Sequence, residues 1–166
     1  LGLKGKEKLI LQIIFSTIFI IFINSINLLN PEIQIWNDLM INVKVWIFPI
    51  ALLTIISLSN SVNLADGLDG LAAGCSSIVF CGLGSEILLK NDSDLVIFSL
   101  LSFCMCGLCL GFLKYNKHPA KIFMGDTGSL AIGGIMGVLS VITNSFFSIL
   151  IISGLFVIEA LSVIIQ

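Results

Sequence analysis

The sequence predicts an all-α polytopic membrane protein, a bundle of about six transmembrane helices. Of the 166 residues, 57% are hydrophobic and only 11% are charged, and the mean hydropathy is +1.13. A soluble domain carries about 25% charged residues, so the deficit involves the whole chain rather than one helix. The hydrophobic residues also gather in long runs, and about 20 apolar residues wound as a helix cross a bilayer core.

Six apolar runs are candidates for these helices, and each is taken as α-helical because lipid offers no hydrogen-bond partner to an open strand. The runs contain many Ile and Val residues but lack the alternation of apolar and polar residues that a membrane β-barrel needs. The second and fifth runs are short, and the fifth is rich in glycine. In chain order the runs are Leu9–Leu29, Val45–Leu58, Leu71–Leu89, Leu95–Leu113, Leu130–Thr143 and Phe146–Ile165.

The lysines predict which side of the membrane each loop faces. With six spans, the amino terminus, loop 60–70 and loop 114–129 share one side, and segments 30–44 and 90–94 share the other. Six of the eight lysines fall on the first side, and the chain has no arginine. Cytoplasmic loops carry the excess of positive charge, so the first side, with both polar loops, is predicted to face the cytoplasm.

The chain is predicted to be a single membrane domain, residues 1–166, that is a truncated part of a larger protein. It begins with Leu rather than Met and ends inside an apolar run, at SVIIQ. Its five cysteines lie in the third and fourth runs with no histidine or charged group beside them, which favours buried thiols over a metal or redox site. The chemistry is therefore expected in the two polar loops.

The first polar loop sets two acidic residues beside glycines. It reads NSVNLADGLDGLAAG from Asn60 to Gly74, with Asp66 and Asp69 three residues apart. If a helix starts here, both carboxylates lie on one face and converge on one target. Helix capping by Asn63 or Asp66 is the alternative. Capping explains one acidic residue but not two Asp–Gly pairs at a membrane border, where charge is costly, so we favour a functional site.

The second polar loop, HPAKIFMGDTGSLAIG from His118 to Gly133, combines glycines with Asp126. Glycine allows close backbone approach, and backbone N–H groups at a helix start favour phosphate. An aspartate beside such a site suits Mg²⁺, which takes one or two carboxylates together with waters and phosphate oxygens. Lys121 adds positive charge for a polyphosphate. The alternative is a helix cap with lysines that only reach the membrane surface.

At these loops the sequence resembles the polyprenyl-phosphate N-acetylhexosamine-1-phosphate transferases. NLADGLDGLAAG and PAKIFMGDTGSLAIGG are similar to two hallmark motifs of that superfamily, and FVIEALSVIIQ favours its muramoyl-pentapeptide branch. The resemblance implies a Mg²⁺-dependent enzyme of the bacterial plasma membrane, with a cytoplasmic active site. It would transfer phospho-MurNAc-pentapeptide from UDP-MurNAc-pentapeptide to undecaprenyl phosphate, giving lipid I and UMP for peptidoglycan synthesis. Relatives of this type are often homodimers.

The motifs also imply which residues form the site. Lys121 is added on electrostatic grounds and is not part of the motif match. The implied catalytic residues are Asp66, Asp69 and Asp126, the implied metal ligand is Asp126, and the substrate-binding residues are Asn63, Asn116, Lys121, Phe123 and Gly125.

Two features of the superfamily are missing from the chain, namely an adjacent aspartate pair upstream and a His-rich loop downstream. We expect both to lie outside residues 1–166, and we therefore expect this chain alone to lack transferase activity. Three alternatives stay open: the UDP-GlcNAc branch of the superfamily, a membrane transporter, and a non-catalytic remnant. A transporter should hold its acidic groups near the middle of the membrane, between inverted repeats, whereas these aspartates border it.

Overall fold

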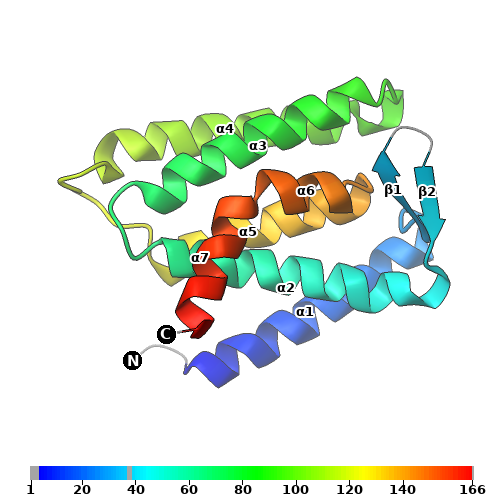
Figure 1. Ribbon diagram of the computed structural model, residues 1–166, viewed down its shortest axis with the longest axis horizontal. Coiled ribbons are helices and arrows are strands. Elements are labelled where there is room, and N and C mark those ends of the chain that lie inside the picture. The colour runs from blue at the N-terminus through cyan, green and yellow to red at the C-terminus, as the bar shows by residue number, and fades with distance from the viewer. Residues whose placement is uncertain (1–3, 37–38, 166) are drawn as a thin grey trace.

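The computed structural model describes residues 4–36 and 39–165, and it confirms an α-helical membrane bundle. Five of the described helical segments are long and apolar enough to cross a membrane. Figure 1 shows them side by side, with the β-hairpin at one end and the shorter α6 and α7 packed against the bundle. The elements are α1 (Gly5–Ser25), β1 (Glu32–Trp36), β2 (Leu39–Asn42), α2 (Ile47–Ala65), α3 (Leu71–Leu89), α4 (Val96–Asn116), α5 (Gly125–Ile142), α6 (Phe146–Ile152) and α7 (Gly154–Ile165).

Helices α2 and α5 pack in close contact, and two glycines of α5 make this possible. A side chain at Gly133 would meet the backbone oxygen of Leu58, and one at Gly137 would lie 2.6 Å from the Cα atom of Ile55. Small residues four apart let two transmembrane helices approach to backbone contact. This contact positions the start of α5 against the end of α2.

Two apolar clusters hold the bundle together. The larger one joins α2, α3, α4 and α5 to the last two helices, and Phe80, Leu83 and Phe156 are fully buried in it. The smaller one joins α1 to α2 at the opposite end of the bundle from the two polar loops, around Ile20 and Ile23. Small and apolar residues recur about every four positions along the helices, and the helix face that they form packs into these clusters.

Two polar loops are shorter than predicted, because the neighbouring helices extend into them. Helix α2 continues past Leu58 to Ala65, and α5 begins at Gly125 instead of Leu130. The polar residues that suggested a loop are helical because their side chains bond to other helices. Asn60, for example, donates to Gln12 of α1 at 2.9 Å. The loops themselves cover only 66–70 and 117–124.

The sixth apolar run does not form a single spanning helix. It splits at Ser153 into the short α6 and α7, so the described residues contain five candidate spans rather than six. The Ser153 hydroxyl donates to the backbone oxygen of Ile149 at 2.6 Å, a side-chain bond that competes with the helix and bends it, and Gly154 follows. In Figure 1, α7 crosses α2 instead of continuing along α6.

The end of the bundle opposite the polar loops carries a β-hairpin that the composition did not predict. Its strands pair antiparallel, with Ile33 opposite Ile41. The hairpin is tied to the α5–α6 turn, where the Asn144 side chain donates to the backbone oxygen of Glu32. In the same region Lys90 pairs with Glu86 at 3.1 Å and donates to the backbone oxygen of Thr143 at 2.6 Å.

Candidate active site

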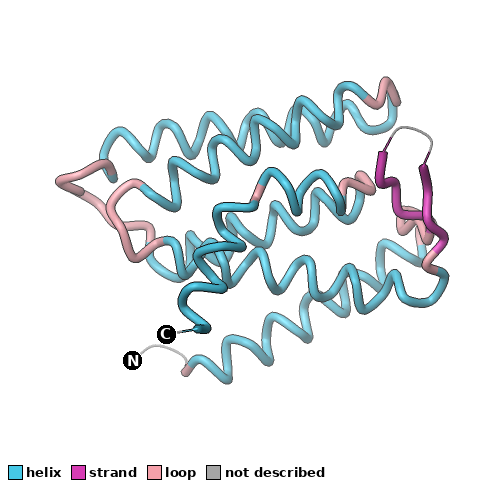
Figure 2. The backbone as a smooth tube through the Cα atoms, in the orientation of Figure 1, coloured by secondary structure: helices cyan, strands magenta, loops and turns pink. Residues whose placement is uncertain are grey.

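The candidate site lies where α2 ends, α5 begins and α1 begins. Figure 2 shows the two loops of this end, 66–70 and 117–124, beside one another at the far end of the molecule from the hairpin. The three segments that the lysine distribution assigned to one side of the membrane are therefore together in space. Side-chain contacts between them define the site.

Asp126 sits in the first turn of α5 and is bonded to the end of α2. Its Oδ1 atom accepts a hydrogen bond from Asn63 Nδ2 at 3.0 Å. The same Asn63 nitrogen donates to Ser129 Oγ at 2.8 Å, and Ser129 donates to the backbone oxygen of Gly125 at 3.0 Å. Gly125 has φ +68°, a conformation that favours glycine. Asn63 thus holds the Asp126 carboxylate in place.

Lys8 of α1 completes this contact, although the sequence analysis gave it no role at the site. Its Nζ atom forms an ion pair with Asp126 Oδ2. The available signal was its place just before the first apolar run, on the predicted side of the aspartates. The position of Lys8 in the sequence does not show which carboxylate it contacts, because its partner depends on how α1 packs beside α5.

Asp66 faces Asp126 from the other side of the α2–α5 junction. It follows the last residue of α2 as its C-cap, and its carboxylate accepts a hydrogen bond from the backbone N–H of Gly125. Partial burial raises the pKa of Asp66, the negative charge of Asp126 raises it further, and the Gly125 hydrogen bond opposes both. A cation bound nearby would relieve the repulsion between these two negative charges.

Asp69 does not join the other two carboxylates and instead binds the second loop. Its Oδ2 atom accepts from the backbone N–H of Ala120 and lies 3.1 Å from His118 Nδ1. Asp66 ends α2 and Asp69 lies in the following turn, so the predicted common helix face does not form. Within residues 4–36 and 39–165 no group of three metal-ligating side chains gathers.

Asn116 ties the two loops together from a buried position. Its side chain is 3% exposed, its Oδ1 atom accepts from the backbone N–H of Gly70 at 3.1 Å, and its Nδ2 atom donates to the backbone oxygen of Ile122 at 2.9 Å. Both ends of the amide are occupied. Asn116 therefore shapes the loops, and any effect on a ligand passes through them.

Phe123 and Lys121 extend from the second loop into solvent. Phe123 is 74% exposed. Lys121 is exposed as well, and its backbone N–H donates to the backbone oxygen of Tyr115 at 2.8 Å. The space around Gly125 is open, because a Cβ atom there would have no neighbour within 4 Å.

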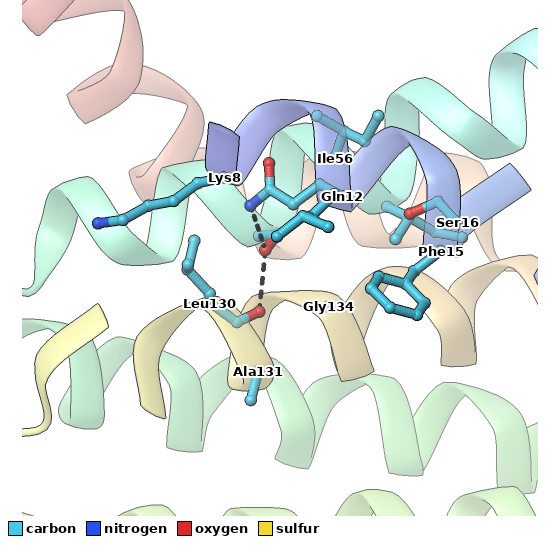
Figure 3. Close-up of a pocket in the computed structure, with 11 residues that line it drawn as sticks. Lys8, Gln12, Phe15, Ser16, Ile56, Leu130, Ala131 and Gly134 are labelled. Carbon is cyan, nitrogen blue, oxygen red and sulfur yellow. Dashed lines mark hydrogen bonds between the residues drawn. The ribbon is translucent and has the colours of Figure 1, made fainter. Parts of the chain in front are cut away.

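An apolar groove runs from Lys8 along the bundle, between α1, α2 and α5. Its volume is about 440 Å³. Figure 3 shows Phe15 and Ala131 on its walls, with Lys8 at one end and Gln12 between α1 and α5. The groove is lined by Lys8, Leu11, Gln12, Phe15, Ser16, Ile55, Ile56, Ser59, Leu130, Ala131 and Gly134.

Comparison with known proteins identifies the family. The family model described as glycosyl transferase family 4 matches residues 1–144, which is most of the chain. The chain belongs to this family. A phospho-N-acetylmuramoyl-pentapeptide-transferase of Prochlorococcus marinus subsp. pastoris is 59% identical over 165 residues, 99% of this chain and 46% of the relative. A protein of the same name from a Synechococcus species is 42% identical over 167 residues, 99% of this chain and 45% of the relative.

The chain therefore spans a little under half the length of the curated relatives it matches. The resemblance to polyprenyl-phosphate sugar-phosphate transferases is confirmed at the level of the family. With five candidate spans, this member of glycosyl transferase family 4 is a multi-pass membrane protein.

Proposed function

We propose that the protein carrying this chain transfers phospho-MurNAc-pentapeptide from UDP-MurNAc-pentapeptide to undecaprenyl phosphate, producing lipid I and UMP. The names of the relatives support this reaction. The observation that carries the proposal is the meeting of Lys8, Asn63 and Asp126, from three helices, at the lysine-rich end of the bundle. That end would face the cytoplasm of a bacterium, at the plasma membrane, where peptidoglycan precursors are made.

Asp126 and Asp66 are suited to hold Mg²⁺. They supply the one or two carboxylates that Mg²⁺ takes from a protein, and phosphate oxygens and waters fill its other positions. A cation already fits against Asp126, since the ammonium group of Lys8 contacts its Oδ2 atom. When bound, the metal ion would neutralise charge on the diphosphate.

The other residues of the chain would bind and orient the two substrates. A phosphate oxygen of the lipid attacks the phosphorus attached to the sugar, and the bond from that phosphorus to the UMP oxygen breaks. Lys8 and Lys121 offer positive charge to the phosphates. Phe123 offers an exposed ring on which uracil can stack, while Asp69 holds the loop that carries Phe123.

The groove beside Lys8 suits the hydrocarbon chain of the lipid substrate. It is apolar, and Lys8 lies at the end nearest Asp126. A polyprenyl phosphate could lie with its chain in the groove and its phosphate near Lys8, while the nucleotide substrate enters from water. This arrangement explains why the charged groups stand at the rim of the bundle rather than inside it.

The test is Mg²⁺-dependent release of UMP by the full-length protein with UDP-MurNAc-pentapeptide and undecaprenyl phosphate. Asp126→Asn should lower the rate about 10²–10³-fold, the effect of removing one strong electrostatic group from a catalytic site. Asp94→Asn is the matched control, because it removes the same charge at the opposite end. An Asp126→Asn rate equal to the control rate would refute the assignment, and turnover of UDP-GlcNAc instead would identify the other branch.

A further inference from the structure

We propose that Gln12 is a positioning residue that holds the site half of α1 against α2 and α5, so that Lys8 stays on the Asp126 carboxylate. The structural part of this proposal stands on the contacts of α1 alone. Its consequence for catalysis rests on the proposed function.

The site half of α1 has almost no buried surface to hold it. From residue 4 to residue 15 only Lys8 and Gln12 are partly buried, and the other residues are exposed. The large apolar side chains of this half, Leu9, Ile10, Leu11, Ile13, Ile14 and Phe15, are between 40% and 65% exposed. Apolar anchoring of α1 begins at Ile20 and Ile23, near the hairpin end. The site half therefore depends on polar contacts.

Gln12 supplies those contacts with both ends of its amide. Its Oε1 atom accepts from Asn60 Nδ2 at 2.9 Å, and its Nε2 atom donates to Ser59 Oγ at 3.3 Å. Ser59 donates in turn to the backbone oxygen of Leu130 at 2.9 Å. Figure 3 shows this chain of hydrogen bonds from α1 to α5. Asn60 is also bonded to the backbone oxygen of Ile56 at 2.8 Å, which orients it toward Gln12.

The network lies one helical turn below the Lys8–Asp126 pair on both helices. Gln12 follows Lys8 by four residues, and Leu130 follows Asp126 by four, so each couple shares one helix face. Lys8 stands about 18 Å along α1 from Ile20, the nearest apolar anchor, at 1.5 Å per residue. The Gln12 hydrogen bonds shorten the stretch of α1 between Lys8 and its nearest anchor to a single helical turn.

The first experiment measures how strongly the ion pair with Asp126 protects the Lys8 amine from a chemical reagent. The full-length protein in detergent micelles is treated with an acetylating reagent, and the acetylation of Lys8 is divided by that of Lys6, an exposed lysine on the same helix. Gln12→Leu should raise this ratio about three- to tenfold, the range expected when interhelical hydrogen bonds in a membrane protein are lost. Asp126→Asn should also raise it, because the ion pair is gone.

Three further variants separate positioning from general damage. Thr17→Val removes a polar group from an exposed site on α1 outside the network and should leave the ratio unchanged. Asn60→Leu removes the partner of Gln12, so Gln12→Leu and Asn60→Leu together should raise the ratio no more than either alone. Gln12→Glu keeps the acceptor for Asn60 and should restore part of the shielding, even where Gln12→Leu folds poorly.

A Lys8 to Lys6 ratio that is the same in the wild type, Gln12→Leu and Gln12→Glu would overturn the proposal. UMP release by the same samples tests the catalytic consequence separately. A raised ratio together with a lower kcat/KM supports both the positioning role and the use of Lys8 in transfer. A raised ratio with unchanged kcat/KM supports the positioning role and refutes the part that the proposed function gives to Lys8.

Discussion

Gly137 lies where α5 crosses α2, and replacing it with alanine tests whether close packing of this pair holds the site together. An added Cβ would lie 2.6 Å from the Cα atom of Ile55 and 3.3 Å from its Cβ atom. Carbon atoms in contact normally stand about 3.5–4.0 Å apart, so the helices must separate by about 1 Å at this point. Overpacking of this kind costs about 1–3 kcal/mol.

Gly134→Ala is the matched control, because an added Cβ at that position meets nothing within 4 Å. Both substitutions gain the same helix propensity, about 1 kcal/mol, so their difference isolates the packing cost. Thermal unfolding in micelles, followed by circular dichroism, should place Gly137→Ala below Gly134→Ala by about 2–4 °C for each kcal/mol. Equal unfolding temperatures would refute the close-packing argument.

Two other substitutions test the two ends of the bundle. Lys90→Met removes a partly buried ion pair with Glu86 and a hydrogen bond to the backbone of Thr143. It should lower the free energy of unfolding by about 1–3 kcal/mol. An unchanged unfolding temperature would contradict this expectation. Asn116→Ala removes the two hydrogen bonds through which Asn116 joins the polar loops, so trypsin should cut the second loop, which contains Lys121, about tenfold faster. Wild-type cleavage rates in the variant would show that Asn116 does not hold the loops.

The membrane class and the helices could be predicted because hydropathy acts on whole segments. The third helix, Leu71–Leu89, has the predicted bounds. The bounds of α2 and α5 were wrong for one physical reason, since polar residues were taken to end a helix. In a membrane bundle a serine or asparagine can continue a helix when another helix supplies its partner, as Asn63 does with Asp126 and Ser129.

The two polar loops could be located from the sequence, but the contacts between their side chains could not. Spacing put Asp66 and Asp69 together, whereas the structure divides them, with Asp66 beside Gly125 and Asp69 beside Ala120. Which carboxylates lie together depends on the loop that each one faces after the helices pack. The three-residue spacing of Asp66 and Asp69 carries no information on that packing. Lys8 was missed for the same reason, because its partner is 118 residues away.

Two kinds of contact hold the site to the bundle, and a substitution in each should have a different effect. The α2–α5 part, with Asn63 and Asp126, rests on backbone contact at the glycines, so Gly137→Ala should displace Asp126 from Asn63 and lower stability together. The α1 part rests on the Gln12 hydrogen bonds, so Gln12→Leu should release Lys8 while α2 and α5 keep their packing. A Gln12→Leu protein that unfolds as early as Gly137→Ala would show that α1 is a structural support of the whole bundle, and that Lys8 is not held by a separate contact.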